Sequence, residues 1–168
     1  AAIATRLSLS LLYYLFFERL PELNVIEGDT LKKAIESVDF IEEKFDIIIS
    51  NPPFIKYDEQ NEEERLVISK VTGDTGKGKV DSYLAFVKLA IEILNRGGLG
   101  LFVLPHNFLL AKNAKKIREH LRDKTDIKVL ADLSALNTSD NASVYVILLI
   151  FQKKPNENSH HPWVMRCK

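Results

Sequence analysis

Four consecutive residues, Asn51-Pro52-Pro53-Phe54, carry the clearest chemical signal in this 168-residue sequence. The Asn51 side-chain oxygen and the Pro52 carbonyl are two acceptors that could bind the hydrogens of one NH₂ group. Such a nitrogen on a nucleobase is a poor nucleophile because its lone pair is delocalised, and two acceptors would stabilise the charge that grows on it during group transfer. Phe54 could stack on the base. The motif predicts transfer to an amino nitrogen, although a rigid turn after a strand is the simpler alternative.

Apolar runs and helical spacing predict the elements that position this motif. Residues 45–49 are nearly all apolar and β-branched, which is typical of a strand covered on both faces, and the prolines end it. Residues 81–96 have the spacing of an amphipathic helix with Asp81 as N-cap, and residues 99–104 form the next apolar strand. Residues 55–80 are polar and contain glycines, which predicts a long functional or mobile loop.

Strands and helices alternate along the rest of the chain. We expect helices at residues 3–20, 31–38 and 112–123, and strands at residues 23–27, 127–133 and 143–151. This alternation predicts an α/β fold with a mostly parallel, doubly wound sheet. Ligands of such sheets bind beyond the carboxyl ends of the strands. Gly28-Asp29-Thr30 and the Asn51 motif follow two of the predicted strands, so we expect both motifs at the ligand site.

The match with a known family extends beyond the four residues. Residues 45–54 resemble the catalytic strand and loop of the amino-methyltransferases. The resemblance implies that Asn51 and Pro52 bind the reacting amine, that Pro53 completes the catalytic loop, and that Phe54 stacks on the substrate.

Three flanking regions add to the resemblance. Residues 24–30 are similar to the family segment whose aspartate contacts the adenine amine of the cofactor, which implies that Asp29, with Thr30 beside it, binds S-adenosyl-L-methionine. Taken alone, Asp29 is as well explained as a turn or helix N-cap residue. Residues 81–86 and 97–109 are similar to segments of the γ-type N6-adenine DNA methyltransferases of restriction–modification systems.

This resemblance implies a Rossmann-like S-adenosylmethionine-dependent methyltransferase fold with an antiparallel last strand. Residues 1–153 would form a partial catalytic domain, and residues 154–168 a tail or the start of a following region. The implied activity is site-specific methyl transfer to N6 of a flipped adenine in DNA, by direct attack and without a metal. Methylation of RNA or of a protein glutamine amide would use the same loop, and a non-catalytic, degenerate methyltransferase scaffold is a further alternative.

The sequence departs from the family pattern in two places. The glycine-rich loop and the acidic residue that hold the cofactor belong before residue 1, so we expect the first two strands of the family sheet to be missing. We also expect these 168 residues alone to bind the cofactor weakly. The family often places an aromatic residue before the last strand, on the second face of the base. Leu136 stands there in this sequence, and Phe108 is the other candidate for that face.

The charge balance limits how the chain contacts nucleic acid. It has 23 basic and 23 acidic residues, which argues against binding through a bulk positive field. We therefore expect DNA contacts to be local, or to come from a target-recognition region outside this chain; a partner subunit or a fused endonuclease is compatible with this. One predicted helix region is basic, and a solvated face is favoured over phosphate contact: Lys112, Lys115, Lys116, Arg118, Arg122 and Lys124.

Other features argue against further classes of protein. The single Cys167 rules out an intrachain disulfide, which suits the cytosol. The apolar opening run lacks a basic leader and is interrupted by Arg6, which indicates a buried helix rather than a signal or membrane segment. Residues 73–79 superficially fit a phosphate loop but lack the hydroxyl residue that should follow, and His160-His161 has no metal-ligand partners at useful spacing.

Overall fold

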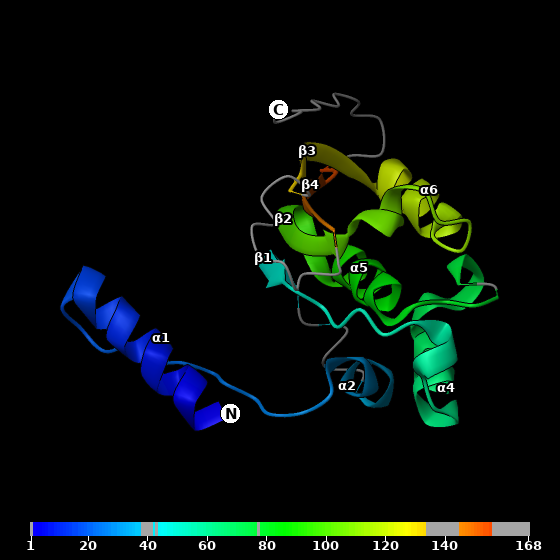
Figure 1. The fold of residues 1–168 in the computed structure, drawn as a ribbon. Coiled ribbons are helices and arrows are strands. Elements are labelled where there is room, and N and C mark those ends of the chain that lie inside the picture. The colour runs from blue at the N-terminus through cyan, green and yellow to red at the C-terminus, as the bar shows by residue number, and fades with distance from the viewer. Residues whose placement is uncertain (1, 38–41, 43, 77, 134–144, 156–168) are drawn as a thin grey trace.

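The computed structural model describes residues 2–37, 42, 44–76, 78–133 and 145–155. These residues form a four-stranded sheet in the order β1-β2-β4-β3 (Figure 1). The strands are β1 (Phe45–Ser50), β2 (Leu94–Pro105), β3 (Thr125–Asp132) and β4 (Val146–Lys153). β1 and β2 are parallel, whereas β4 is antiparallel to both of its neighbours. Three of the described strands therefore run in one direction and only the last is reversed, as the sequence predicts.

The central helix is α5 (Ser82–Ile93), which packs against β2 and has nine of its twelve residues buried. Its helical spacing was clear in the sequence, but it ends at Ile93 because β2 already begins at Leu94. The helices around it are α2 (Thr30–Glu36) and α4 (Glu62–Thr72), which pack on α5, and α6 (Lys115–Lys124), which contacts α5 and β3. Short 3-10 turns are η1 (Tyr57–Glu59), η2 (Gly73–Thr75) and η3 (His106–Leu109).

A glycine makes the contact between β2 and β4 possible. Gly100 pairs with Phe151, and a Cβ atom on Gly100 would lie 2.3 Å from the Phe151 ring. The Phe151 ring stacks on Phe102, which lies on β2 like Gly100, with the two ring centroids 5.9 Å apart. The buried face of β2 therefore requires glycine opposite the phenyl ring, since any larger side chain would displace it.

The apolar strand predicted at residues 45–49 is confirmed as β1, but the prediction that both of its faces are covered is wrong. Ile47 is 58% exposed and Ile49 is 76% exposed, and their spacing puts them on one face. The strand predicted at residues 23–27 is also wrong, because these residues have no regular structure. No described strand lies beside them to share backbone hydrogen bonds.

The apolar helix at the start of the chain is confirmed as α1 (Ala2–Phe17), but its predicted burial is wrong. Phe16 is 75% exposed, and α1 stands apart from the sheet and the other helices (Figure 1). The aromatic side chains of α1 contact one another or solvent instead of a core, with the Tyr13 and Phe17 centroids 4.5 Å apart. None of the described helices has the length and apolarity needed to cross a membrane.

The segment at residues 55–80, predicted as a long loop, contains α4. Asn61 caps this helix by accepting a hydrogen bond from the Glu64 backbone at 2.9 Å, and the Glu64 carboxylate accepts one from the Asn61 backbone at 2.8 Å. Residues 73–79 follow a helix rather than a buried strand, which agrees with excluding a phosphate loop. The predicted tail lies outside the described residues from residue 156 onward, and so does the histidine pair.

Candidate functional site: two cavities beside the Asn-Pro-Pro corner

The Asn51-Pro52-Pro53-Phe54 loop leaves the carboxyl end of β1 and runs along the N-terminus of α5. Ser82, the first residue of α5, ties the two together through three hydrogen bonds. Its hydroxyl donates to the Pro53 carbonyl at 2.5 Å and accepts from the Ile55 N–H at 3.0 Å, while its own N–H donates to the Ile55 carbonyl at 3.0 Å. One buried serine therefore fixes the path of the loop.

Two more side chains hold the end of the loop. The Asp81 carboxylate occupies the N-cap position of α5 but caps no helical N–H; it accepts instead from the Tyr57 N–H at 3.0 Å. The buried Gln60 amide donates to the carbonyls of Ile55, at 3.2 Å, and Val80, at 3.0 Å. These bonds satisfy backbone groups that have no strand or helix partner, which keeps an irregular loop rigid.

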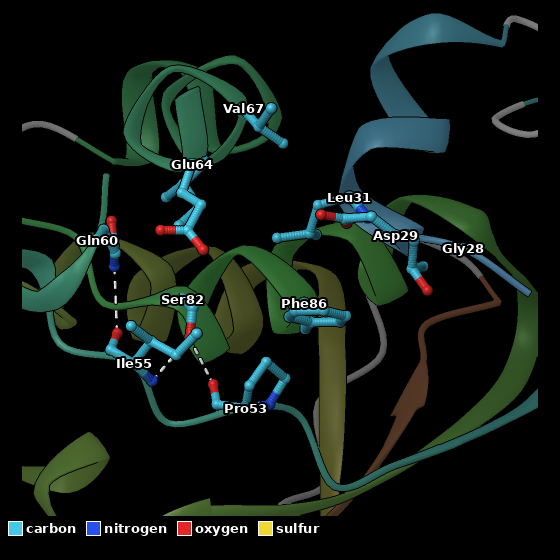
Figure 2. A pocket seen from close by; sticks show the side chains of 12 residues that line it. Gly28, Asp29, Leu31, Pro53, Ile55, Gln60, Glu64, Val67, Ser82 and Phe86 are labelled. Atoms are coloured by element: carbon cyan, nitrogen blue, oxygen red, sulfur yellow. Dashed lines mark hydrogen bonds between the residues drawn. The ribbon is translucent and has the colours of Figure 1, made fainter. Parts of the chain in front are cut away.

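One cavity, which we call the Asp29 cavity, lies between this loop, α2, α4 and α5 (Figure 2). Its volume is about 450 Å³, within the range of small-molecule sites, which is about 300–1,000 Å³. It brings together the two motifs that the sequence predicts at one site, because Asp29, Thr30 and Pro53 all line it. Its full lining is Gly28, Asp29, Thr30, Leu31, Pro53, Ile55, Gln60, Glu64, Val67, Ile68, Ser82 and Phe86.

Asp29 is the N-cap of α2 as well as part of the cavity wall. Its Oδ1 accepts from the N–H groups of Leu31, at 2.9 Å, and Lys32, at 3.2 Å. The Oδ2 atom of Asp29 makes no hydrogen bond with a described residue. Asp29 can therefore cap α2 through Oδ1 and still offer Oδ2 to a ligand, so the two roles considered from the sequence are compatible. A salt bridge between Lys32 and Glu63 joins α2 to α4 beside the cavity.

Sequence reasoning missed three side chains of the Asp29 cavity. Phe86 presents its ring from α5, Glu64 reaches in from the first turn of α4, and Gln60 lies at the start of that helix (Figure 2). The Gln60 Oε1 atom is buried and has no hydrogen-bond partner among the described residues. The pattern Asn61-x-x-Glu64 is a capping-box signature and would have predicted α4 and, with it, this wall of the cavity.

A second cavity, which we call the Phe54 cavity, opens on the other side of the loop. Its volume is about 370 Å³, and its lining is Phe54, Lys56, Asp81, Tyr83, Pro105, His106, Asn107, Leu110 and Tyr145. Phe54 is half-buried, so one part of its ring packs on the core and the rest is available to a ligand. Pro53 and Phe54 thus line different cavities although they are neighbours in the chain.

Phe108, expected on the second face of the substrate base, does not fit that role. It is 2% exposed, and it does not line the Phe54 cavity. Instead it packs edge-on against Tyr83, with centroids 6.4 Å apart, and Tyr83 packs edge-on against Phe54 at 6.1 Å. Phe108 therefore packs against Tyr83, and Tyr83 in turn packs against Phe54. Leu136, the other expected residue, lies outside the described residues.

Asn51 and Pro52 lie just before the point where the loop separates the two cavities. Asn51 is exposed and Pro52 is buried. The hydrogen bonds that fix the loop involve Pro53, Ile55 and Tyr57, and none with a described residue involves the Asn51 side chain or the Pro52 carbonyl. Neither residue lines the Asp29 cavity or the Phe54 cavity, so the binding of an NH₂ group by these two oxygens stays a prediction.

Two of the six cations of the basic helix region make contacts that serve the fold. Arg118 donates to the carbonyls of Phe108, at 2.7 Å, and Ala111, at 2.9 Å, which fixes the turn before α6. Lys116 donates to the Asp74 carbonyl at 3.3 Å. These contacts give a structural role to Arg118 and Lys116, and the other four cations are exposed, as expected of a solvated helix face.

Comparison with known proteins gives one family across most of the chain. The model of the Eco57I restriction-modification methylase family matches residues 20–138. The type II restriction enzyme and methyltransferase RM.Eco57I of Escherichia coli is 26% identical over 137 residues, which cover 78% of this chain and 14% of that protein. The chain thus spans about one seventh of the length of this curated relative.

Two other similarities concern the fold and the catalytic loop. A Listeria monocytogenes structure described as a class I S-adenosylmethionine-dependent methyltransferase superposes with a TM-score of 0.56 at 14% identity, covering 74% of this chain and 37% of that one. The chain therefore has the Rossmann-like fold of these methyltransferases. A release factor glutamine methyltransferase of Clostridium acetobutylicum is 36% identical over 78 residues, 43% of this chain and 25% of that protein.

Proposed function

Since this chain belongs to the Eco57I restriction-modification methylase family, we propose that it is catalytic-domain sequence of an enzyme that methylates N6 of adenine in DNA. The observation that carries the proposal is that the residues directly after Asn51 and Pro52 line two different cavities, Pro53 the Asp29 cavity and Phe54 the Phe54 cavity. One cavity contains the aspartate expected to bind the cofactor, and the other is walled by the phenyl ring expected to stack on the base. Donor and acceptor would meet at the corner.

The Asp29 cavity fits S-adenosylmethionine by its chemistry. The Asp29 carboxylate and the unpartnered Oε1 of Gln60 are acceptors for the amine or hydroxyl groups of a nucleoside, and the Phe86 ring offers an apolar wall. When bound, the cofactor supplies a methyl group on a positively charged sulfur. Glu64 and Asp29 add negative charge to the same cavity, which favours a cationic ligand.

The residues of the corner would orient and activate the amine. The Asn51 side-chain oxygen and the Pro52 carbonyl would each accept one N–H of the adenine amino group, which directs its lone pair at the methyl group. Both acceptors would stabilise the positive charge on nitrogen as the N–C bond forms and the S–C bond breaks. The Ser82 bonds and the two prolines keep the corner rigid, so little reorganisation is needed during the reaction.

DNA would enter on the side of the Phe54 cavity. A base must leave the duplex to reach the corner, at a cost of a few kcal/mol that stacking on Phe54 would offset. Lys56 is an exposed cation in the wall of this cavity and is suited to a phosphate contact. Sequence specificity would come from a target-recognition region of the complete enzyme, as expected from a neutral chain that matches only part of its relative.

Substitution of the corner tests this function in the complete protein. Unmethylated genomic DNA and tritiated S-adenosylmethionine are incubated with wild type and Asn51→Ala, and the product nucleoside is identified by mass spectrometry. We expect N6-methyldeoxyadenosine from wild type and a loss of rate of about a hundredfold or more in the variant, with cofactor binding retained.

Asn113→Ala is the matched control, because Asn113 makes only an exposed hydrogen bond to the Lys79 carbonyl far along the chain from the corner. An Asn51→Ala variant that methylates DNA at the wild-type rate would contradict the proposal and favour a scaffold in which the corner is not catalytic.

A glutamine amide is the second candidate acceptor, because of the similarity to a release factor glutamine methyltransferase over 43% of the chain. An amide nitrogen, like the adenine amine, has a delocalised lone pair and needs the same two acceptors. The same assay separates the candidates when release factor protein or RNA replaces DNA. Methyl transfer to protein or RNA but not to DNA would replace our proposal with one of these.

A further inference from the structure

The hydroxyl group of Tyr83 is buried in the core and has no part in the function proposed above. Tyr83 is 2% exposed, and its hydroxyl is buried without a hydrogen-bond partner among the described residues. Leaving such a group unpaired costs about 1–3 kcal/mol, so buried hydroxyl groups without partners are rare in native proteins. Phenylalanine would fill the same space without this cost. The hydroxyl therefore calls for a partner that arrives with a ligand.

The position of Tyr83 indicates which ligand that is. Tyr83 lines the Phe54 cavity, and its ring is perpendicular to Phe54, with an interplanar angle of 81°. A planar ligand that stacks on Phe54 lies parallel to that ring. Its hydrogen-bond acceptors, among them the ring nitrogens of a heterocycle, lie around its perimeter, so a hydroxyl donor in the wall of the same cavity can bind it only there.

The electrostatics of Tyr83 make it a hydrogen-bond donor. Burial, and then the nearby negative charge of Asp81, raise the pKa of the Tyr83 hydroxyl above its usual value. The group therefore stays protonated at any physiological pH and can donate to a neutral acceptor. Unprotonated ring nitrogens of adenine, at positions 1, 3 and 7, are acceptors of this kind.

We propose that the Tyr83 hydroxyl donates a hydrogen bond to a ring nitrogen of the adenine that stacks on Phe54, and so helps to select the base. This rests on the proposed function and adds a specificity-determining residue to it. The corner recognises an NH₂ group, which cytosine, guanine and a glutamine amide also carry. A donor at the ring edge distinguishes among them, because it requires an acceptor at a fixed position relative to that NH₂ group.

Atom-by-atom changes in the ligand test this contact. The probes are 2′-deoxyadenosine and its 1-deaza, 3-deaza and 7-deaza analogues, each of which replaces one ring nitrogen with C–H. Their binding to the complete protein is measured by NMR titration for wild type and Tyr83→Phe. We expect one analogue to bind wild type about five- to tenfold more weakly than deoxyadenosine, the effect of losing one neutral hydrogen bond.

The variant identifies Tyr83 as the source of that effect. Tyr83→Phe should bind deoxyadenosine about five- to tenfold more weakly and should no longer distinguish the affected analogue from the parent nucleoside. A loss of rigidity alone would weaken all four ligands equally. Tyr57→Phe is the matched control, since it removes a hydroxyl from a half-buried tyrosine outside the Phe54 cavity and should leave the pattern unchanged.

The outcomes separate this contact from the proposed reaction. Equal responses of wild type and Tyr83→Phe to all four nucleosides would overturn the contact, and so would the absence of nucleoside binding to wild type. Failure to methylate DNA, with the analogue pattern intact, would instead remove the DNA acceptor and leave Tyr83 as a contact to adenine from another source.

Discussion

The two cavities beside the Asn-Pro-Pro corner are built in different ways. The Asp29 cavity is walled by α2 and α4, which pack on the core through the aliphatic side chains of Leu31, Val67 and Ile68. Exposed polar links are added at its rim: the cap of α2, the salt bridge between α2 and α4, and the capping box of α4. The Phe54 cavity rests instead on two aromatic rings, Tyr83 and Phe108, which are both 2% exposed.

This difference implies different energetic costs for changes around the two cavities. Exposed salt bridges and caps contribute about 1 kcal/mol or less each, so the loss of one polar link of the Asp29 cavity costs little while its aliphatic contacts remain. Removing a buried aromatic ring costs several times more. We therefore expect the fold to tolerate changes in the polar links of the Asp29 cavity better than changes in the rings that support Phe54.

The largest effect is predicted for Phe108→Ala. This substitution removes a buried ring behind Tyr83 and should lower the free energy of unfolding by about 3–5 kcal/mol, as measured by urea denaturation. Leu110→Ala, a change at a side chain that is 75% exposed, should alter stability by about 0.5 kcal/mol or less. Similar small losses of stability in both variants would show that the Phe54 cavity does not rest on the core.

An intermediate effect is predicted for Asp29→Ala. Loss of the cap should destabilise the protein by about 1 kcal/mol, and loss of the carboxylate should weaken S-adenosylmethionine binding about tenfold in calorimetry. Asp29→Asn keeps a capping oxygen but not the charge, so it should restore stability without restoring cofactor affinity. Binding of deoxyadenosine should be the same in all three proteins; a parallel loss would mean that the two cavities are not independent.

The smallest effect concerns the other end of α5, away from both cavities. Hydrogen bonding to His120, and then to Lys88, lowers the pKa of Glu92 to about 2. A carboxylate with a lowered pKa stabilises the folded state above its unfolded pKa of about 4.3, and this contribution is lost as the pH falls toward 2. Because Glu92 is about half exposed, the change should be below about 1 kcal/mol.

Glu92→Gln should remove that part of the acid dependence while leaving stability at pH 7 only slightly lower. Urea denaturation of both proteins at pH 7, 4 and 2.5 measures the free energy of unfolding at each pH. A change in ligand binding at the two cavities in Glu92→Gln at pH 7 would contradict this prediction, because it would show that the C-terminal end of α5 affects the cavities at its N-terminal end.

Sequence reasoning located the corner, the two motifs of the Asp29 cavity and most strands, because each of these depends on local signals. The prolines after an apolar run end β1 wherever the chain folds, and Asp29 stands at a helix start. Residues 1–153 as one partial catalytic domain remains an expectation. The capping box at Asn61 was equally local, and it was overlooked because a polar segment was taken for a loop.

The other wrong predictions concern which surfaces meet. The helices α1 and α5 are similarly apolar, yet α5 lies in the core and α1 does not, since burial depends on a partner that the apolar content of a helix does not specify. Residues 23–27 have strand-like composition but no neighbouring strand. Phe108 was assigned to the ligand by its place in a motif, whereas only the three-dimensional structure shows Tyr83 between it and Phe54.

The placement of Pro53 and Phe54 on opposite sides of one peptide unit has a consequence for how such enzymes diversify. Substitutions around the phenyl ring can change the acceptor that we propose for the Phe54 cavity without altering the walls of the Asp29 cavity, because the backbone bound by Ser82 separates the two. A single ancestral loop could thus come to act on a nucleobase in one lineage and on an amide in another.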